Sequence, residues 1–217
     1  MSKTNLLILI CLFTSALLWR AEPPLASILS FTTTKLLAGR VWILVTTLFI
    51  HADPIHLLGN MLFLYVFGNT LERLAGGGKM LTAFFIGGAA TNILSIPFYP
   101  ADVPLVGASA AIFTVAATVM LIKPLHFSWL FLLPVGLVAI LYFLFNVFAV
   151  YRGLSGNVAY VSHIIGFLLG IPFGVAWSPT WVRSIVVTIG LLIVFILIAT
   201  FVAPLVFHTI DMKPLGL

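Results

Sequence analysis

Charged residues are scarce in this sequence. Ten Lys or Arg and five Asp or Glu make up only 7% of the 217 residues, whereas about a quarter of the residues of a typical soluble domain are charged. Apolar residues make up 62%, and the mean hydropathy is +1.26. These values exclude an ordinary soluble domain and indicate a helical protein that crosses a membrane several times.

Other features are also missing from the sequence. The single cysteine, Cys11, cannot form a disulfide within the chain. The basic residues are scattered singly between apolar segments, which excludes a nucleic-acid-binding patch and is typical of residues that anchor helix ends. Strands of alternating apolar and polar residues are absent, which argues against a transmembrane barrel.

Long apolar runs are abundant, and they predict seven membrane spans. The runs lie at residues 5–19, 56–72, 80–98, 107–122, 127–150, 159–177 and 181–206. Most are close to the roughly 20 residues that cross a bilayer, or somewhat shorter. The residues before Ala21 lack the small-residue pattern of a signal-peptide cleavage site, so we expect the first run to be a retained span. Residues 20–55 are less apolar and predict an interfacial loop with short helices. We expect one transmembrane domain over residues 1–217.

Three of these spans carry polar residues at one depth. Asn60, Ser109 and His163 lie 13 or 14 residues before the ends of the second, fourth and sixth spans, which run in the same direction. At about 1.5 Å per residue they form one layer, about 20 Å from the far surface of a hydrocarbon core about 30 Å thick. Non-helical backbone at this depth must line a protein-walled cavity, because lipid cannot satisfy its polar groups. Ser109 is therefore expected at the floor of a wet cavity.

The surroundings of Ser109 favour nucleophilic chemistry. A helix that begins near Ser109 directs unpaired backbone N–H groups and its positive dipole end into the cavity, which suits an oxyanion. Gly107 allows the tight backbone geometry just before the helix. His56 and Asn60, four residues apart, share one helix face and can add donors to the same oxyanion.

His163 is the candidate general base. Gly166 and Gly170 follow it on the same helix face, and such small residues allow close helix packing in membranes. If this face meets the helix of Ser109, the histidine reaches the serine hydroxyl and can act as base and then as acid. We expect a Ser-His dyad, with His163 oriented by packing against Phe113, because no carboxylate is evident as a third member; Asp102 is the only reserve.

Simpler interpretations compete with this one. A serine in a membrane helix usually bonds its own backbone, and a lone intramembrane histidine is more often a packing or proton-relay residue than a base. His51 and His56, with Asp53 between them, are conceivable metal ligands, but Pro54 breaks any shared helix and the spacing matches no standard ligand motif. We therefore expect no metal and no cofactor.

Taken together, the spaced motifs make the chain resemble the rhomboid intramembrane serine proteases over roughly residues 40–177. The motifs are Gly107-x-Ser109, His163-x-x-Gly166-x-x-x-Gly170, and His51-x-x-x-x-His56-x-x-x-Asn60 followed by Glu72. Two positions that are commonly glycine in this family are Ala110 and Thr114 here, and the loop motif that commonly reads Trp-Arg appears as Trp42-Ile43, with Arg40 nearby.

The resemblance implies a fold and a set of residue roles. It implies an all-α polytopic fold with a six-helix core over residues 1–177 and an extra C-terminal helix over 181–206. It implies Ser109 as nucleophile, His163 as base, and an oxyanion site formed by His56, Asn60 and the Ser109 backbone N–H. Phe113 takes the place of an aromatic residue that stacks under the histidine. Gly107 would contribute to oxyanion stabilisation, and His51, Gly166 and Gly170 would support the site.

The resemblance also implies partners and location. Substrates would be single-span or polytopic membrane proteins, which enter from the bilayer between the second and fifth spans under the loop 151–158. We expect an integral protein of the plasma (inner) membrane of a prokaryote, with a cytoplasmic N-terminus, an active site open to the exterior, and neither nucleic acid nor metal as a partner.

Two other functions compete with proteolysis. A non-catalytic rhomboid-like protein would bind or escort membrane clients without cleaving them. A transporter would use the buried histidines as a proton path, but seven spans without a two-fold repeat argue against it.

Overall fold

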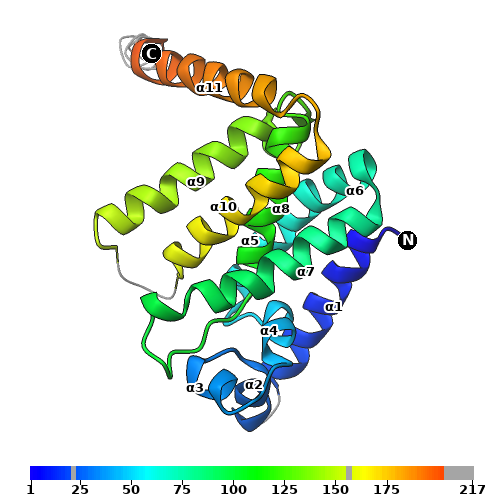
Figure 1. Cartoon of the computed structure of the whole chain (residues 1–217), viewed down its shortest axis with the longest axis vertical. Coiled ribbons are helices and arrows are strands. Elements are labelled where there is room, and N and C mark those ends of the chain that lie inside the picture. The colour runs from blue at the N-terminus through cyan, green and yellow to red at the C-terminus, as the bar shows by residue number, and fades with distance from the viewer. Residues whose placement is uncertain (21–22, 155–157, 203–217) are drawn as a thin grey trace, which may run out of the picture.

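The computed structural model describes residues 1–20, 23–154 and 158–202, and these residues form a helical bundle (Figure 1). Two short strands, β1 (Phe127–Ser128) and β2 (Leu133–Pro134), pair as an antiparallel hairpin. The helices in chain order are α1 (Lys3–Leu18), α2 (Pro23–Leu29), α3 (Thr33–Leu37), α4 (Ile43–Thr46), α5 (Pro54–Phe63), α6 (Asn69–Ala75), α7 (Gly77–Leu94), α8 (Ser109–Ile122), α9 (Val135–Tyr151), α10 (Tyr160–Trp177) and α11 (Trp181–Leu197).

The predicted spans correspond to helices of this bundle, with some changes at their ends. A π-helical turn (Leu64–Gly68) joins α5 to α6, so the second predicted span is one helical rod over residues 54–75. The expected start of the fifth span at residue 127 is wrong, because the hairpin occupies residues 127–134 and α9 begins only at Val135. The short helices expected within residues 20–55 are present as α2, α3 and α4, whereas the interfacial location of this segment stays a prediction; residues 21–22 lie outside the described residues.

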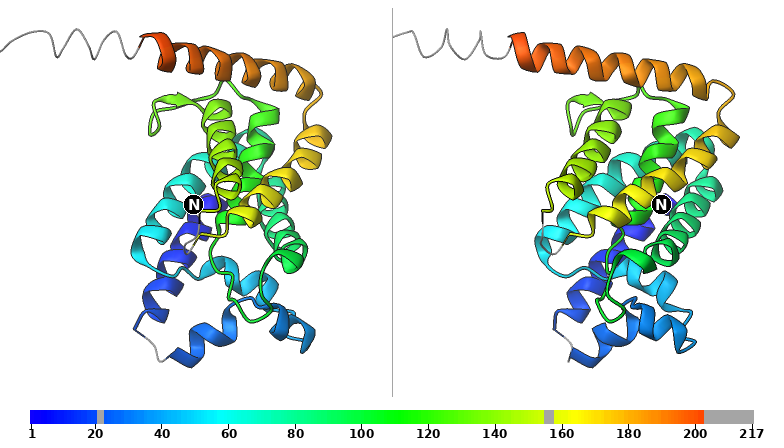
Figure 2. Two further views of the ribbon diagram at one scale, coloured as in Figure 1. Left: turned by 90° about the vertical axis from the view of Figure 1, so that its left-hand side faces the viewer. Right: turned by 60° about the vertical axis from the view of Figure 1, so that its left-hand side comes forward.

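Helix α8 is the centre of the bundle, with α7, α9 and α10 packed around it (Figures 1 and 2). It has only 14 residues, and every one from Ala110 to Leu121 is buried. It begins shortly after Gly107, whose φ of +114° suits a glycine. It ends at Ile122, because Pro124 disfavours helical geometry at Lys123, the residue before it. The fourth predicted span is thus a short, fully enclosed helix.

Helices α8 and α10 make the most extensive contact in the bundle, and their backbones approach closely. A Cβ atom built on Gly166 would collide with the carbonyl oxygen of Ala110, and one on Gly170 would collide with that of Thr114. Thr114 Oγ1 donates to the Gly166 carbonyl at 2.8 Å, and Thr118 Oγ1 donates to that of Gly170 at 3.2 Å. The glycine face of α10 therefore packs on α8.

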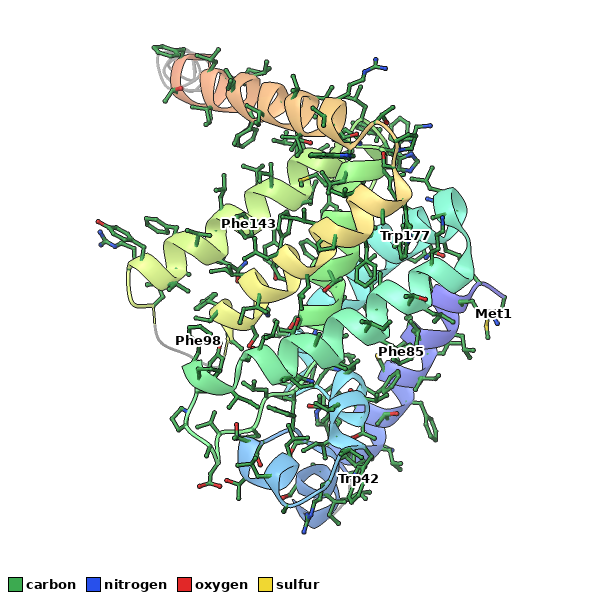
Figure 3. All side chains as sticks on the ribbon, in the orientation of Figure 1. Met1, Trp42, Phe85, Phe98, Phe143 and Trp177 are labelled. Atoms are coloured by element: carbon green, nitrogen blue, oxygen red, sulfur yellow. The ribbon has the colours of Figure 1, made fainter. Side chains whose placement is uncertain are left out.

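Aromatic stacking joins α9 to the same pair of helices. Phe143 on α9 points toward α10 and stacks on Phe167, with 4.4 Å between the ring centroids (Figure 3). Helix α9 is therefore held beside α8 and α10 along its middle.

A different contact joins α7 to α10 at one end of the bundle. Lys79 Nζ lies 5.4 Å from the ring centroid of Trp177, at the end of α10.

The N-terminal helix is tied to α6 through one carboxylate. Glu72 accepts hydrogen bonds from the backbone N–H groups of Lys3 and Thr4, both at 2.8 Å, and from the Thr4 hydroxyl at 2.7 Å. These donors belong to the first turn of α1, whose N–H groups lack partners within the helix. Glu72 is therefore a structural residue, remote from the polar layer.

Helix α11 lies across the end of the bundle, opposite α2 to α4, and does not run alongside α8 to α10 (Figures 1 and 2). Its contacts are with the ends of α8 and α9, where Trp181 and Ile185 pack on the core and Ser184 and Thr188 are buried. By length and hydropathy, Tyr160–Trp177 and Trp181–Phe201 could each cross a membrane. The seventh span at 181–206 stays a prediction, and its residues 203–206 lie outside the described part of the chain.

The contact between α8 and α10 yields a stability prediction. We expect Gly170→Ala to lower the free energy of unfolding by about 1–3 kcal/mol, because the new methyl group meets the Thr114 carbonyl and separates the two helices. Gly190→Ala in α11 is the matched control, since a Cβ there meets nothing within 4 Å and alanine favours helix by up to about 1 kcal/mol. Thermal unfolding in detergent measures both; equal midpoints for the two variants would contradict the packing described.

Candidate active site

Ser109 stands at the N-terminus of α8, where the chain changes from loop to helix. No side chain among the described residues caps this end, so the first backbone N–H groups of α8 are left for other partners. The hydroxyl is half-buried and faces a cavity of about 740 Å³. This arrangement agrees with the position expected from the sequence.

His163 lies opposite Ser109, in the first turn of α10. Its Nε2 atom is 2.8 Å from Ser109 Oγ, and its side chain is buried. The glycine at position 166 makes this possible, because it lets α10 approach the backbone of Ala110 one residue after the serine. The predicted pair of hydroxyl and imidazole is therefore within hydrogen-bond distance.

Phe113 packs on the ring of His163 as expected. The two rings are stacked, with 4.7 Å between centroids and 18° between planes. Tyr142 from α9 stacks on the other side of Phe113 at 4.5 Å, and Phe63 from α5 stacks on Tyr142 at 4.5 Å. A continuous aromatic stack thus extends from the imidazole across α8 and α9 to α5.

The sequence analysis missed one residue of this site, Asn146 in α9. Its Oδ1 atom is 2.8 Å from His163 Nδ1, and only 1% of the residue is exposed. The sequence feature that could have pointed to Asn146 is its amide side chain inside the apolar run 127–150, because polar residues in membrane spans are costly and therefore unusual. His163 therefore has a polar partner at each ring nitrogen.

None of the carboxylates on the described residues touches the histidine. Asp53 caps α5 by accepting a hydrogen bond from the His56 backbone N–H at 2.8 Å. Asp102, the reserve third member, is exposed and accepts a hydrogen bond from the Thr34 hydroxyl at 2.6 Å. The place that a carboxylate would take beside His163 Nδ1 is occupied by the amide of Asn146.

His56 and Asn60 face the same cavity from α5. A Cβ atom built on Gly107 would lie 2.8 Å from the imidazole of His56 and 3.3 Å from Asn60 Nδ2, so the bare glycine leaves room between these side chains and the serine loop. Asn60 Nδ2 is buried and has no hydrogen-bond partner among the described residues. An unpaired buried donor costs about 1–3 kcal/mol unless a ligand satisfies it.

His51 supports the loop that carries Ser109. The backbone N–H of Ala108 points to His51 Nε2 at 3.4 Å, and His51 Nδ1 is 3.0 Å from Ser15 Oγ. These partners are mutually consistent if Nε2 accepts and Nδ1 donates. Trp19 Nε1 also donates to the His51 carbonyl at 2.9 Å. His51 thereby links the serine loop to α1.

The two residues that replace glycines fit into this packing. Thr114 occupies space beside α7, where a Cβ on Gly87 would collide with its side chain. Ala110 is buried against α10, with its carbonyl oxygen at Gly166.

Comparison with known proteins decides the family. The rhomboid domain family matches residues 38–180, and this range contains Ser109, His163, Asn146 and the cavity residues of α5. The chain belongs to the rhomboid family.

Several curated proteins of the rhomboid family are similar to this chain. Rhomboid-like protein 11, chloroplastic, of Arabidopsis thaliana is 29% identical over 58% of this chain and 49% of its own length. The putative rhomboid protease YdcA of Bacillus subtilis (strain 168) is 37% identical over 35% of this chain and 38% of its own. Rhomboid protease GluP of the same organism is 37% identical over 35% of this chain and 14% of its own. The chain spans less than half the length of each of these relatives.

The rhomboid loop before Ser109 yields a second stability prediction. We expect Gly107→Ala to destabilise the fold more than Gly39→Ala, although both glycines have positive φ, of +114° and +83°. Positive φ costs an alanine about 1–3 kcal/mol at either position, but only the methyl group at position 107 also meets His56, whereas position 39 is open. Thermal unfolding in detergent compares them, and equal losses would show that His56 does not restrict this loop.

Proposed function

We propose that this chain is an intramembrane serine endopeptidase that cleaves transmembrane segments of other membrane proteins. The observation that carries the proposal is the 2.8 Å contact between Ser109 Oγ and His163 Nε2, at a cavity beside the N-terminus of a buried helix. Membership of the rhomboid family and the protease names of two relatives support it.

In the proposed reaction the two residues act in sequence. Ser109 Oγ attacks the scissile carbonyl carbon while His163 Nε2 takes the hydroxyl proton. The tetrahedral intermediate collapses, the peptide C–N bond breaks, and His163 gives the proton to the departing amine. A water molecule, deprotonated by the same nitrogen, then hydrolyses the acyl-enzyme and releases the second product.

The oxyanion of that intermediate needs donors on the α5 side of the serine. We assign this role to Asn60 Nδ2, to the His56 imidazole and to the backbone N–H of Ser109. The lack of a partner for Asn60 Nδ2 supports this assignment, because a donor held ready for the transition state is unpaired in the free enzyme. The positive end of α8 adds to the stabilisation.

For the placement in the membrane we propose the arrangement that the resemblance to rhomboids implies. Residues 1–177 would form the six-helix core, with 20–55 at the interface and 181–206 as the extra helix. The N-terminus would be cytoplasmic and the cavity open to the exterior. The relatives include both bacterial and plant proteins, so a prokaryotic plasma membrane stays a prediction.

Substrates would be single-span or polytopic membrane proteins with helix-destabilising, small residues at the cut. We place their entry between α5 and α9, under the loop 151–158, of which residues 155–157 lie outside the described part. The cavity supports this route because its walls include His56 and Asn60 from α5 and Tyr142 from α9. The stacked rings of Phe63 and Tyr142 bridge these two helices and would have to separate.

The dyad is tested by removing each member. We expect Ser109→Ala and His163→Ala each to abolish cleavage of a model single-span substrate in detergent or vesicles, because one removes the nucleophile and the other the base. A fluorophosphonate probe should label the wild type and fail to label Ser109→Ala. Cleavage that survives either substitution would show that Ser109 and His163 are not a catalytic dyad. A folded wild type that neither cleaves the substrate nor reacts with the probe would favour a non-catalytic protein that binds membrane clients.

The oxyanion site is tested at Asn60. We expect Asn60→Leu, which keeps the volume but removes the donor, to lower kcat about 100-fold or more. KM should change little, because the hydrogen bond is made mainly in the transition state. Steady-state cleavage measures both constants. A variant whose KM rises while kcat stays constant would place Asn60 in substrate binding instead.

A further inference from the structure

Asn146 is a polar side chain in an otherwise apolar part of α9. It is buried, and both ends of its amide make short hydrogen bonds: Nδ2 donates to the Tyr142 carbonyl at 2.7 Å, and Oδ1 lies 2.8 Å from His163 Nδ1. A buried amide is costly unless its donor and acceptor groups are paired. The pairing with His163 is therefore the feature of Asn146 that needs an explanation.

The two contacts fix the orientation of the amide. A carbonyl oxygen only accepts hydrogen bonds, so the group that faces Tyr142 must be the NH₂ end. Oδ1 then faces the imidazole, and since it also only accepts, His163 Nδ1 must carry the hydrogen. In a neutral imidazole the other nitrogen, Nε2, then has a free lone pair, and this lone pair faces the Ser109 hydroxyl at 2.8 Å.

The aromatic stack cannot make this selection. Phe113 contacts the face of the imidazole and restrains the ring plane, but both tautomers present the same face to it. With the hydrogen on Nε2, two lone pairs would face each other between Nδ1 and Asn146 Oδ1, and the serine would meet a donor. Only the contact at the ring edge distinguishes the tautomers.

We propose that Asn146 is a positioning residue, which holds His163 in the tautomer whose Nε2 can accept the proton of Ser109. This inference rests on the proposed proteolytic function. The site would then be a Ser-His-Asn arrangement in which the third member is a neutral amide. Its dipole supports the protonated ring during the reaction without placing a negative charge in the bundle.

The charge of the residue at position 146 should change the pH dependence of kcat. The titratable groups that share the cavity with His163 are Asp53 and His56 beside and on α5, Tyr142 on α9, and Tyr99, which meets the Ser162 backbone; Tyr160 lies one turn earlier on α10. Asp53, the carboxylate among these groups, accepts a hydrogen bond from the His56 backbone N–H and makes no hydrogen bond or ion pair with His163 among the described residues. A carboxylate at position 146 would therefore place a negative charge directly beside His163 Nδ1, where the described residues have only the Asn146 amide, and would stabilise the protonated histidine.

The test compares Asn146→Leu and Asn146→Asp with a matched control, Asn92→Leu. Asn92 is another buried asparagine, on α7, and its Nδ2 donates to the Leu44 carbonyl. We expect Asn146→Leu to lower kcat about 10- to 100-fold with KM within about threefold, because the base is misoriented. Asn146→Asp, which keeps the acceptor, should recover activity at alkaline pH, with the acidic limb of its kcat profile moved to higher pH. Asn92→Leu should keep the wild-type kcat and profile.

A measurement on the unaltered chain does not depend on activity. Nitrogen-15 NMR of histidine-labelled protein, with the His163 signals assigned by comparison with His163→Ala, should show the hydrogen on Nδ1 at neutral pH. Hydrogen on Nε2, a wild-type kcat in Asn146→Leu, or an Asn146→Asp variant that is inactive at every pH would each overturn the inference. Inactivity of the wild type together with hydrogen on Nδ1 would instead overturn the proposed function and leave the positioning of the ring intact.

Discussion

The close contact between α8 and α10 determines where every group of the site lies. Apolar surfaces gain little by meeting each other inside a bilayer, so helices there associate through tight packing and interhelical hydrogen bonds. Both occur here: Gly166 and Gly170 let the backbones approach, and Thr114 and Thr118 donate to the carbonyl groups of those glycines. The distance between Ser109 and His163 follows from this contact, because each residue stands at the start of its helix.

The short length of α8 is the second constraint. A helix of 14 residues cannot cross a bilayer alone, and α8 begins at Ser109, inside the protein. The loop before it then needs polar partners, which the Thr47 carbonyl provides to the Gly107 N–H at 3.0 Å and His51 provides to the Ala108 N–H. A buried helix start, with its loop satisfied by Thr47 and His51, is what creates a polar cavity beside Ser109.

Much of this site could be predicted from the sequence, because helix geometry converts residue counts into depth. The positions of Asn60, Ser109 and His163 before the ends of their spans placed them in one layer, and the spacing of Gly166 and Gly170 marked the face that meets α8. The start of α9 could not be predicted in the same way, since an apolar hairpin and an apolar helix share the same composition. The direction of α11 depends on contacts at the end of the bundle, which hydropathy does not describe.

Asn146 was missed for a different physical reason. Carboxylates are the usual partners of a catalytic histidine, and none of those in the sequence was expected to lie beside His163. Inside a membrane bundle, an ionised carboxylate loses several kcal/mol of hydration, and its attraction to the histidine offsets this only when the ring is protonated. An amide oxygen accepts the same Nδ1 hydrogen at a much smaller desolvation cost. The buried position of His163 therefore favours a neutral partner, and asparagine is a residue type that supplies it.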